Sequence, residues 1–306
     1  MRTAPAVVKA PDNRAPINTD ARLTKLVEKL VSRGGVHHAN VSIASGDGEQ
    51  QWSAAAGPAD YVPQPDTPFF IASITKRFII TLVLQAHERG ELDLSAPILH
   101  YLSAETIAGL HIFRGADWTP KITVRHLASH TSGLPDHFET LNDGTSLNTH
   151  LATGQDLGWT FDDMIRTTRQ QQRPYFKPQD LTASRQKARY SDTGFQLLIR
   201  ILETVTGNSF DELLTERIFD PLSLTSTWLP RHRRLALEVE PSPLYTKQRR
   251  VDLTTMLEST NDLFSTNGDL LTFQRALLSG EIFRDPDTRN YLTERRNRLR
   301  NIPVLN

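Results

Sequence analysis

The stretch Phe69-Phe70-Ile71-Ala72-Ser73-Ile74-Thr75-Lys76 contains the pattern on which the fold depends, an apolar run that delivers a serine with a lysine three residues later. On a helix, residues i and i+3 share a face, so the hydroxyl of Ser73 and the amine of Lys76 would lie within reach of each other. A serine beside an amine that can take its proton suits acyl transfer. The pattern is short, however, and Ser184 and Lys187 repeat it.

The two copies differ in their surroundings. Ser184 lies in a polar run without apolar periodicity, so Lys187 would be solvated and keep a pKa of about 10.4. Ser73 starts a predicted helix over 73–89 that carries an apolar face and ends at Gly90. Burial and the positive end of the helix dipole both disfavour the ammonium form, so we expect the pKa of Lys76 to fall toward neutrality.

Composition excludes several classes of function. The chain has 306 residues, 38% of them hydrophobic, which is enough for a large core. Lys plus Arg and Asp plus Glu balance at 35 each, and we expect the basic run 295–300 to be a solvated helix face, so no nucleic-acid partner is predicted. The absence of cysteine excludes disulfides, thiolate metal sites and a cysteine nucleophile.

The N-terminal segment lacks the apolar stretch of about 7–15 residues that a secretory signal needs. Nor does the chain contain an apolar run of about 18 residues that could span a membrane. We therefore expect a flexible tail over 1–18, no membrane span and a cytoplasmic location.

Apolar periodicity and turn residues predict the main elements. A hairpin is predicted from 41–44 and 51–54, and 230–250 is expected to be an exposed polar connection. The predicted helices, with the glycines that end them, are 23–31 before Gly34-Gly35, 193–205 before Gly207, one that begins at Ser209, and 268–279 before Gly280.

Two further motifs accompany Ser73 and Lys76. Tyr190-Ser191-Asp192 directly precedes a predicted helix, and His130-Thr131-Ser132-Gly133-Leu134-Pro135 lies between it and the serine. In this order and at these separations the blocks resemble the serine β-lactamase and penicillin-binding-protein superfamily, in particular class C β-lactamases, D-alanyl-D-alanine carboxypeptidases and β-lactamase-like esterases. The similarity runs from about 20 to 306 and includes the segments 89–94, 202–207, 218–222 and 264–270.

The resemblance implies an α+β fold in which an antiparallel sheet is flanked by helices. We expect one β-lactamase-like domain over 19–306, with a sheet lobe from about 19–72 and 250–306. A mainly helical lobe, about 73–249, would be inserted between these segments, and the site would lie in the cleft between the lobes.

The resemblance also implies roles for individual residues. Ser73 would be the acylated nucleophile, Lys76 would hold and help deprotonate it, and Tyr190 would carry protons between Ser73 and the leaving group. The Lys76 ammonium should make the Tyr190 phenol more acidic. Whether Lys76 or Tyr190 is the base stays open, because the two should titrate as a coupled pair. Asp192 would contact substrate where the family usually has Asn, and its carboxylate lowers our expectation of β-lactam turnover.

The predicted activity is that of a serine hydrolase that acts through an acyl-enzyme on a small ester or amide, without metal or cofactor. A non-catalytic binding or scaffold protein is the alternative, and acyl transfer to another acceptor is a further one; the oligomeric state is left open. Ser132 beside His130 is interpreted as a structural turn rather than a catalytic pair, since the chain contains no G-x-S-x-G. The adjacent His37 and His38 would face opposite sides of a strand, which disfavours a metal site.

One family motif is not found. Relatives carry Lys, His or Trp followed two residues later by Gly on a strand near the C-terminus, and no Lys, His or Trp in this sequence has that neighbour. Those strands hold the second oxyanion donor, and loss of one such donor costs about 2.7–4 kcal/mol. We expect a family enzyme without its C-terminal portion; a degraded gene and a site completed by another chain are the alternatives.

Overall fold

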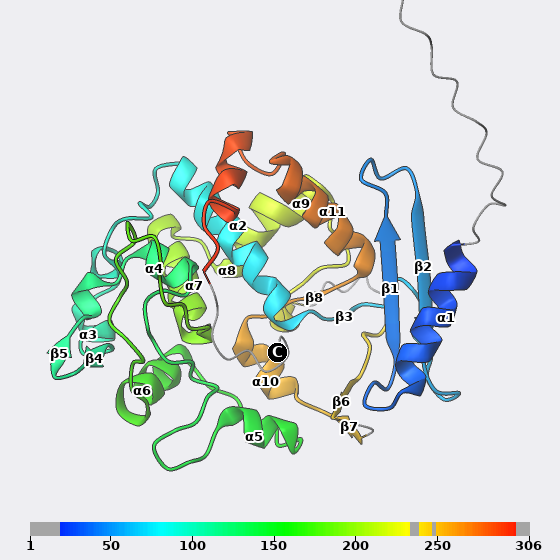
Figure 1. The fold of residues 1–306 in the computed structure, drawn as a ribbon, viewed down its shortest axis with the longest axis horizontal. Coiled ribbons are helices and arrows are strands. Elements are labelled where there is room, and N and C mark those ends of the chain that lie inside the picture. The colour runs from blue at the N-terminus through cyan, green and yellow to red at the C-terminus, as the bar shows by residue number, and fades with distance from the viewer. Residues whose placement is uncertain (1–18, 233–238, 247–248, 298–306) are drawn as a thin grey trace, which may run out of the picture. The chain divides into compact units, whose positions relative to one another are not determined.

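The computed structural model describes residues 19–232, 239–246 and 249–297 (Figure 1). The chain divides into two compact units, 1–65 and 66–306, which are treated separately. The tail expected over 1–18 lies outside the described residues. The elements are α1 Thr19–Ser32, β1 Ala39–Ala44, β2 Gln51–Ala56, β3 Phe69–Phe70, α2 Thr75–Glu88, α3 Ala104–Ile107, β4 Ile112–Phe113, β5 Ala116–Asp117, α4 Val124–Ala128, α5 Leu147–Ala152, α6 Phe161–Gln171, α7 Asp192–Thr206, α8 Phe210–Leu214, α9 Asp220–Leu222, β6 Leu244–Thr246, β7 Arg249–Val251, α10 Thr254–Thr260, β8 Phe264–Ser265 and α11 Asn267–Ser279.

The first unit is a helix packed on a hairpin. Strands β1 and β2 pair antiparallel with Val41 opposite Ala54, which confirms the predicted hairpin. Leu23 and Val27 of α1 are buried with Ala54 and Ala56, and these small strand residues let the helix approach the hairpin closely.

Helix α2 is the centre of the second unit. Its side chains at Phe78 and Leu82 are fully buried, and the Phe78 ring stacks on Phe273 of α11 with the ring centres 3.8 Å apart. In Figure 1, α4 and α7 lie on one side of α2 and α9 and α11 on the other. A helix covered on most of its faces must be apolar around most of its circumference, as this one is.

The structure confirms the predicted start of α8 at Ser209 and the predicted ends of α7 and α11 at glycine. Ser209 caps α8 by accepting a hydrogen bond from the Glu212 N–H, and Thr266 caps α11 in the same way. Gly207 and Gly280 follow α7 and α11 with φ angles of 74° and 85°, a left-handed conformation that ends a helix at little cost only for glycine.

The strands of the second unit form short antiparallel pairs. β3 pairs with β8, which places Phe70 opposite Phe264 and ties the segment before Ser73 to a distant part of the chain. Helices and antiparallel strands together confirm the α+β class. No helix in the described part of the chain is long and apolar enough to cross a membrane.

The prediction that residues 230–250 form an exposed connection is partly wrong. Residues 244–246 and 249–251 form the hairpin β6–β7, and the buried Ser242 donates its N–H to the Pro68 carbonyl at 2.7 Å. Arg249 and Arg250 are exposed on β7. Because the strand faces water at these charged residues, the sequence was interpreted as an exposed connection. The remaining parts of this stretch, 233–238 and 247–248, lie outside the described residues.

Candidate active site

Ser73 lies in a single 3-10 turn, Ala72–Ile74, that leads directly into α2. The predicted helix therefore begins two residues later than expected. Ala72 has a φ of 46°, in the left-handed region that non-glycine residues seldom adopt. The preceding Ile71 is buried and donates its N–H to the Leu263 carbonyl at 2.9 Å. The chain thus changes direction at Ala72. Ser73 is exposed, while the residue two positions before it is held in the core.

Lys76 occupies the first turn of α2 and is almost fully buried, with 8% of its surface exposed. Its Nζ donates a hydrogen bond to Ser73 Oγ at 3.3 Å, which confirms the proximity predicted from their spacing. Nζ also forms an ion pair with the Asp192 carboxylate.

Tyr190, in the segment just before α7, contacts the same serine. Its hydroxyl lies 2.5 Å from Ser73 Oγ, and the Lys76 Nζ is 5.1 Å from the centre of its ring. Ser73 and Lys76 of one predicted motif and Tyr190 of another are therefore in direct contact through one oxygen atom.

The loop that begins at His130 fixes the position of Tyr190. The His130 ring stacks on the Tyr190 ring with the centres 4.7 Å apart, and its Nδ1 accepts the Ser191 N–H at 3.2 Å. Ser191 caps α7 and donates its hydroxyl to the Pro135 carbonyl at 2.8 Å. Gly133, with a φ of 80°, has no room for a side chain, because a Cβ there would come within 1.9 Å of the Phe176 carbonyl oxygen. This loop is a structural turn that positions the tyrosine motif.

The charge state predicted for Lys76 is wrong. Burial alone lowers the pKa of Lys76, but the negative charges of Asp192 and Asp262 outweigh it, and the pKa is raised above its ordinary value. The sequence indicated that Lys76 is buried at the start of a helix. It did not indicate the ion pair with Asp192, which opposes the effect of burial on the pKa of Lys76. Lys76 is therefore an ammonium ion at neutral pH.

The acidic phenol expected at Tyr190 is also wrong. Burial and the Asp192 charge raise the pKa of Tyr190, and the opposing effect of the Lys76 ammonium does not cancel them. The phenol keeps its proton at neutral pH and is able to donate it.

Asp262 is a second carboxylate beside Lys76. It lies just before β8, and burial raises its pKa to about 7, while the Lys76 charge and a hydrogen bond from the Thr75 hydroxyl act in the opposite direction. The Thr75 hydroxyl in turn accepts the Leu263 N–H at 2.9 Å. A residue inside the serine–lysine motif thus ties Asp262 to the start of α2.

Three more titratable side chains surround this group, and burial shifts the pKa of each toward its uncharged form. Asp136 is buried and accepts the Asp192 N–H at 3.3 Å; burial, with the Asp192 charge, raises its pKa well above the ordinary value. Burial lowers the pKa of both His130 and His137 to about 4. Among the described residues, no three His, Cys, Asp or Glu side chains are grouped to hold a metal ion.

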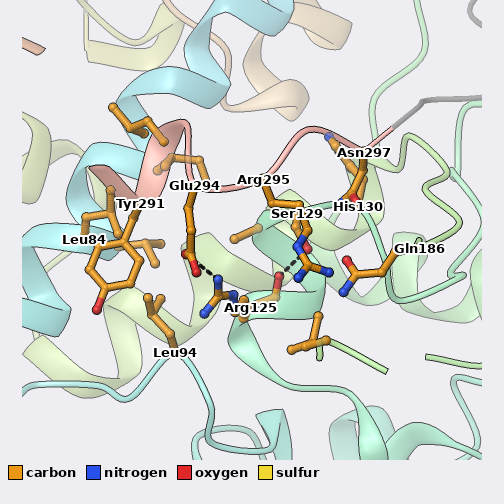
Figure 2. Close-up of a pocket in the computed structure, with 15 residues that line it drawn as sticks. Leu84, Leu94, Arg125, Ser129, His130, Gln186, Tyr291, Glu294, Arg295 and Asn297 are labelled. Atoms are coloured by element: carbon orange, nitrogen blue, oxygen red, sulfur yellow. Dashed lines mark hydrogen bonds and ion pairs between the residues drawn. The ribbon is translucent and has the colours of Figure 1, made fainter. Parts of the chain in front are cut away.

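A cavity of about 320 Å³ adjoins the His130 loop (Figure 2). Ile80, Val83 and Leu84 of α2 line the cavity, as do Arg125 and Glu294, which form an ion pair with each other. His130 belongs to its lining, whereas Ser73, Lys76 and Tyr190 do not. The His130 ring thus contacts Tyr190 and also borders a separate cavity.

The other candidate residues do not form a second site. Ser184 and Lys187 are exposed and lie outside any helix, as predicted. Ser132 is buried, and its hydroxyl accepts the Leu134 N–H within the turn. His37 and His38 precede β1 rather than lie on it, and their Nδ1 atoms are 3.0 Å apart.

Sequence reasoning missed Asp262 and Asp136. Asp262 directly precedes the apolar pair Leu263-Phe264, so a charged residue next to apolar residues was the available signal. Asp136 directly follows the turn at Pro135, where an aspartate is common for local reasons and carries little information.

The chain was compared with protein families and with individual relatives. The Beta-lactamase family profile matches residues 23–303. Penicillin-binding protein 4 of Amycolatopsis lactamdurans is 30% identical over 192 residues, which are 59% of this chain and 44% of that relative. The chain therefore spans less than half the length of that protein.

Solved structures show the same fold. The D-stereospecific amidohydrolase from a Streptomyces species is 27% identical with a TM-score of 0.69, over 90% of this chain and 77% of that chain. The D-amino acid amidase from Ochrobactrum anthropi SV3 is 25% identical with a TM-score of 0.64, over 87% and 73% of the two chains.

Proposed function

Since the chain belongs to the Beta-lactamase family, we propose that it is a serine hydrolase that forms an acyl-enzyme at Ser73. One observation carries the proposal: Ser73 Oγ lies 2.5 Å from the Tyr190 hydroxyl and 3.3 Å from Lys76 Nζ. An exposed serine oxygen between a proton carrier and a fixed positive charge suits nucleophilic attack on a carbonyl carbon.

In the proposed acylation, Ser73 Oγ bonds to the carbonyl carbon of the substrate. Lys76 is already protonated and does not accept the serine proton. Instead, that proton passes to the Tyr190 oxygen while the phenol proton passes to the leaving nitrogen or oxygen, whose bond to the carbonyl carbon breaks. The Lys76 ammonium stabilises the negative charge that develops on Ser73 Oγ during this transfer.

In the proposed deacylation, the two proton transfers through Tyr190 run in the opposite direction. Water attacks the acyl carbon and gives a proton to the Tyr190 oxygen as the phenol returns its own to Ser73 Oγ, so the acid product leaves and the free serine is restored. Tyr190 ends each half-reaction protonated, in agreement with its raised pKa.

We propose a small amide or ester as the substrate, with an amide of a D-amino acid as the first candidate. By their names, one relative is a D-stereospecific amidohydrolase and another is a D-amino acid amidase, and both share the fold over most of this chain. Asp192 supports this choice over β-lactams, because its carboxylate would repel the carboxylate that penicillins carry.

A fluorophosphonate probe tests the nucleophile directly. Attack by Ser73 Oγ on phosphorus expels fluoride and leaves one covalent adduct, which intact mass spectrometry of the complete gene product detects. We expect the adduct in the wild type and in Ser184→Ala, which removes the serine of the second serine–lysine pair, but not in Ser73→Ala. A wild-type protein without any adduct would refute the hydrolase proposal in favour of a non-catalytic binding protein.

A further inference from the structure

Asp262 is held beside Lys76 by contacts on both sides of it. The Thr75 hydroxyl donates to its carboxylate, and the Ile71 N–H bonds to the carbonyl of the next residue, Leu263, at 2.9 Å. On the other side, Asn261 adopts a left-handed φ of 56°, and its amide donates to Gln196 Oε1 of α7 at 2.8 Å. These contacts leave the carboxylate little freedom to turn away from Lys76.

The charges in contact with one another around Lys76 nearly cancel. The Lys76 ammonium and the Asp192 carboxylate form one ion pair, which is neutral as a whole. The surrounding His130, His137 and Tyr190 are uncharged at neutral pH, and burial shifts the pKa of Asp136 toward its protonated form. Among these described groups, Asp262 has a pKa of about 7, so its ionisation adds one negative charge to the site near neutral pH.

We propose that Asp262 is a specificity-determining residue: its carboxylate gives the site a negative charge that favours substrates whose acyl group is positively charged over neutral substrates of the same shape. This inference rests on the proposed hydrolase function and narrows its substrates to amine-bearing acyl groups, such as those of amino acids with a free amine. Asp262 and Asp192 both act on Lys76, whose Nζ lies 3.3 Å from Ser73 Oγ, and both are half-buried, so their field extends to a molecule bound at Ser73.

The proposed selectivity depends on pH. The charged groups that face Asp262 are Lys76 on α2, which lowers its pKa, and Asp192 at the start of α7, which raises it. With a pKa of about 7, Asp262 is mostly protonated below neutral pH and mostly ionised above it. Preference for a cationic substrate should therefore increase as the pH rises through neutrality.

Two p-nitrophenyl esters of the same shape measure this preference. The 4-(trimethylammonio)butanoate ester carries a permanent positive charge, and the 5,5-dimethylhexanoate ester replaces the nitrogen with carbon. Dividing kcat/KM for the first ester by kcat/KM for the second cancels effects of pH on the chemical step that both share. Product is followed at the isosbestic wavelength of p-nitrophenol, so that its own titration does not contribute.

In the wild type, we expect this ratio to rise about tenfold between about pH 6 and about pH 8.5, as one charge appears beside the substrate. In Asp262→Asn the ratio should be low and independent of pH. Asp143→Asn makes the same chemical change at an exposed position in a turn and should behave as the wild type.

The possible results separate this inference from the proposed function. A wild-type ratio that does not change with pH overturns the role of Asp262, even where Asp262→Asn fails to fold. A ratio in folded Asp262→Asn that still rises with pH overturns it as well, and in both cases Ser73-dependent hydrolysis leaves the proposed function intact. If neither ester is hydrolysed in a Ser73-dependent manner, the proposed function fails, and the inference with it.

Discussion

Lys76 and Asp192 form an ion pair across the first turns of α2 and α7, the two helices that carry the serine–lysine and tyrosine motifs. The negative partner lies at a helix N-terminus, where the helix dipole stabilises it. A lysine that could have been a neutral base is thereby fixed as a cation. The carboxylate at position 192 thus raises the pKa of the lysine beside Ser73.

Replacing Asp192 with Asn should make the site more reactive toward penicillins. The substitution removes a carboxylate that repels the anionic substrate, and it lowers the pKa of Lys76 by removing its largest opposing charge. We expect labelling of Ser73 by a fluorescent penicillin to accelerate about tenfold, because removing a charge repulsion of about 1.4 kcal/mol raises a rate by a factor of ten. Asp143→Asn, at an exposed position, should label at the wild-type rate. Equal rates in all three proteins would contradict the role given to Asp192.

Tyr190→Phe should retain the structure and lose most of the catalysis. The phenyl ring preserves the stack on His130, whereas the hydroxyl that lies 2.5 Å from Ser73 Oγ is gone. Loss of a positioned proton carrier lowers kcat by about 10²–10⁴-fold. Steady-state hydrolysis of a p-nitrophenyl ester, together with thermal unfolding, checks both parts. A variant with nearly full kcat would assign proton transfer to another group.

Gly133→Ala should destabilise the second unit more than Gly109→Ala does. Both glycines have positive φ angles, but a Cβ meets the Phe176 carbonyl oxygen at Gly133 and nothing within 4 Å at Gly109. We expect about 1–2 kcal/mol of destabilisation for Gly109→Ala from the backbone alone. For Gly133→Ala we expect more than about 3 kcal/mol, because the loop must also move. Denaturant unfolding measures both; similar values would show that the turn tolerates a side chain.

Asp262→Asn should gain stability relative to the wild type as the pH rises. The ordinary pKa of this carboxyl is 3.8, and the fold raises it to about 7. Between these values the folded protein holds a proton that the unfolded chain has lost, so wild-type stability falls with increasing pH. Asn has no such proton to lose. The difference in unfolding free energy should grow by at least about 1 kcal/mol from about pH 4 to about pH 8, and a constant difference would refute the raised pKa.

Much of the fold was predictable because it is encoded locally. The hairpin over 39–56 and the helices that end at Gly207 and Gly280 follow from short patterns of apolar residues and turn glycines. The hairpin β6–β7 was missed because its strands are short and its arginines face water. Patterning identifies a strand only where one side is buried.

The candidate site was predictable only as far as its motifs extend. The spacing of Ser73 and Lys76 fixed their proximity, and the resemblance to a known family placed Tyr190 with them. Leu263, next to Asp262, bonds to Thr75 across 188 residues of sequence, a contact that no local pattern reports. The charge of Lys76 was predicted wrongly for the same reason, since it depends on carboxylates brought in from distant segments.

The left-handed conformation of Ala72 allows the residues on either side of it to lie in different environments. Ile71 must be in the core and Ser73 at the surface, and a reversal at one residue between them meets both. The position of Ser73 is thereby fixed by the length of this junction: an insertion or deletion of a single residue between β3 and α2 would turn the serine inward or move the lysine away from its carboxylates. In an evolving gene this junction would accept substitutions of residue type far more readily than changes of length.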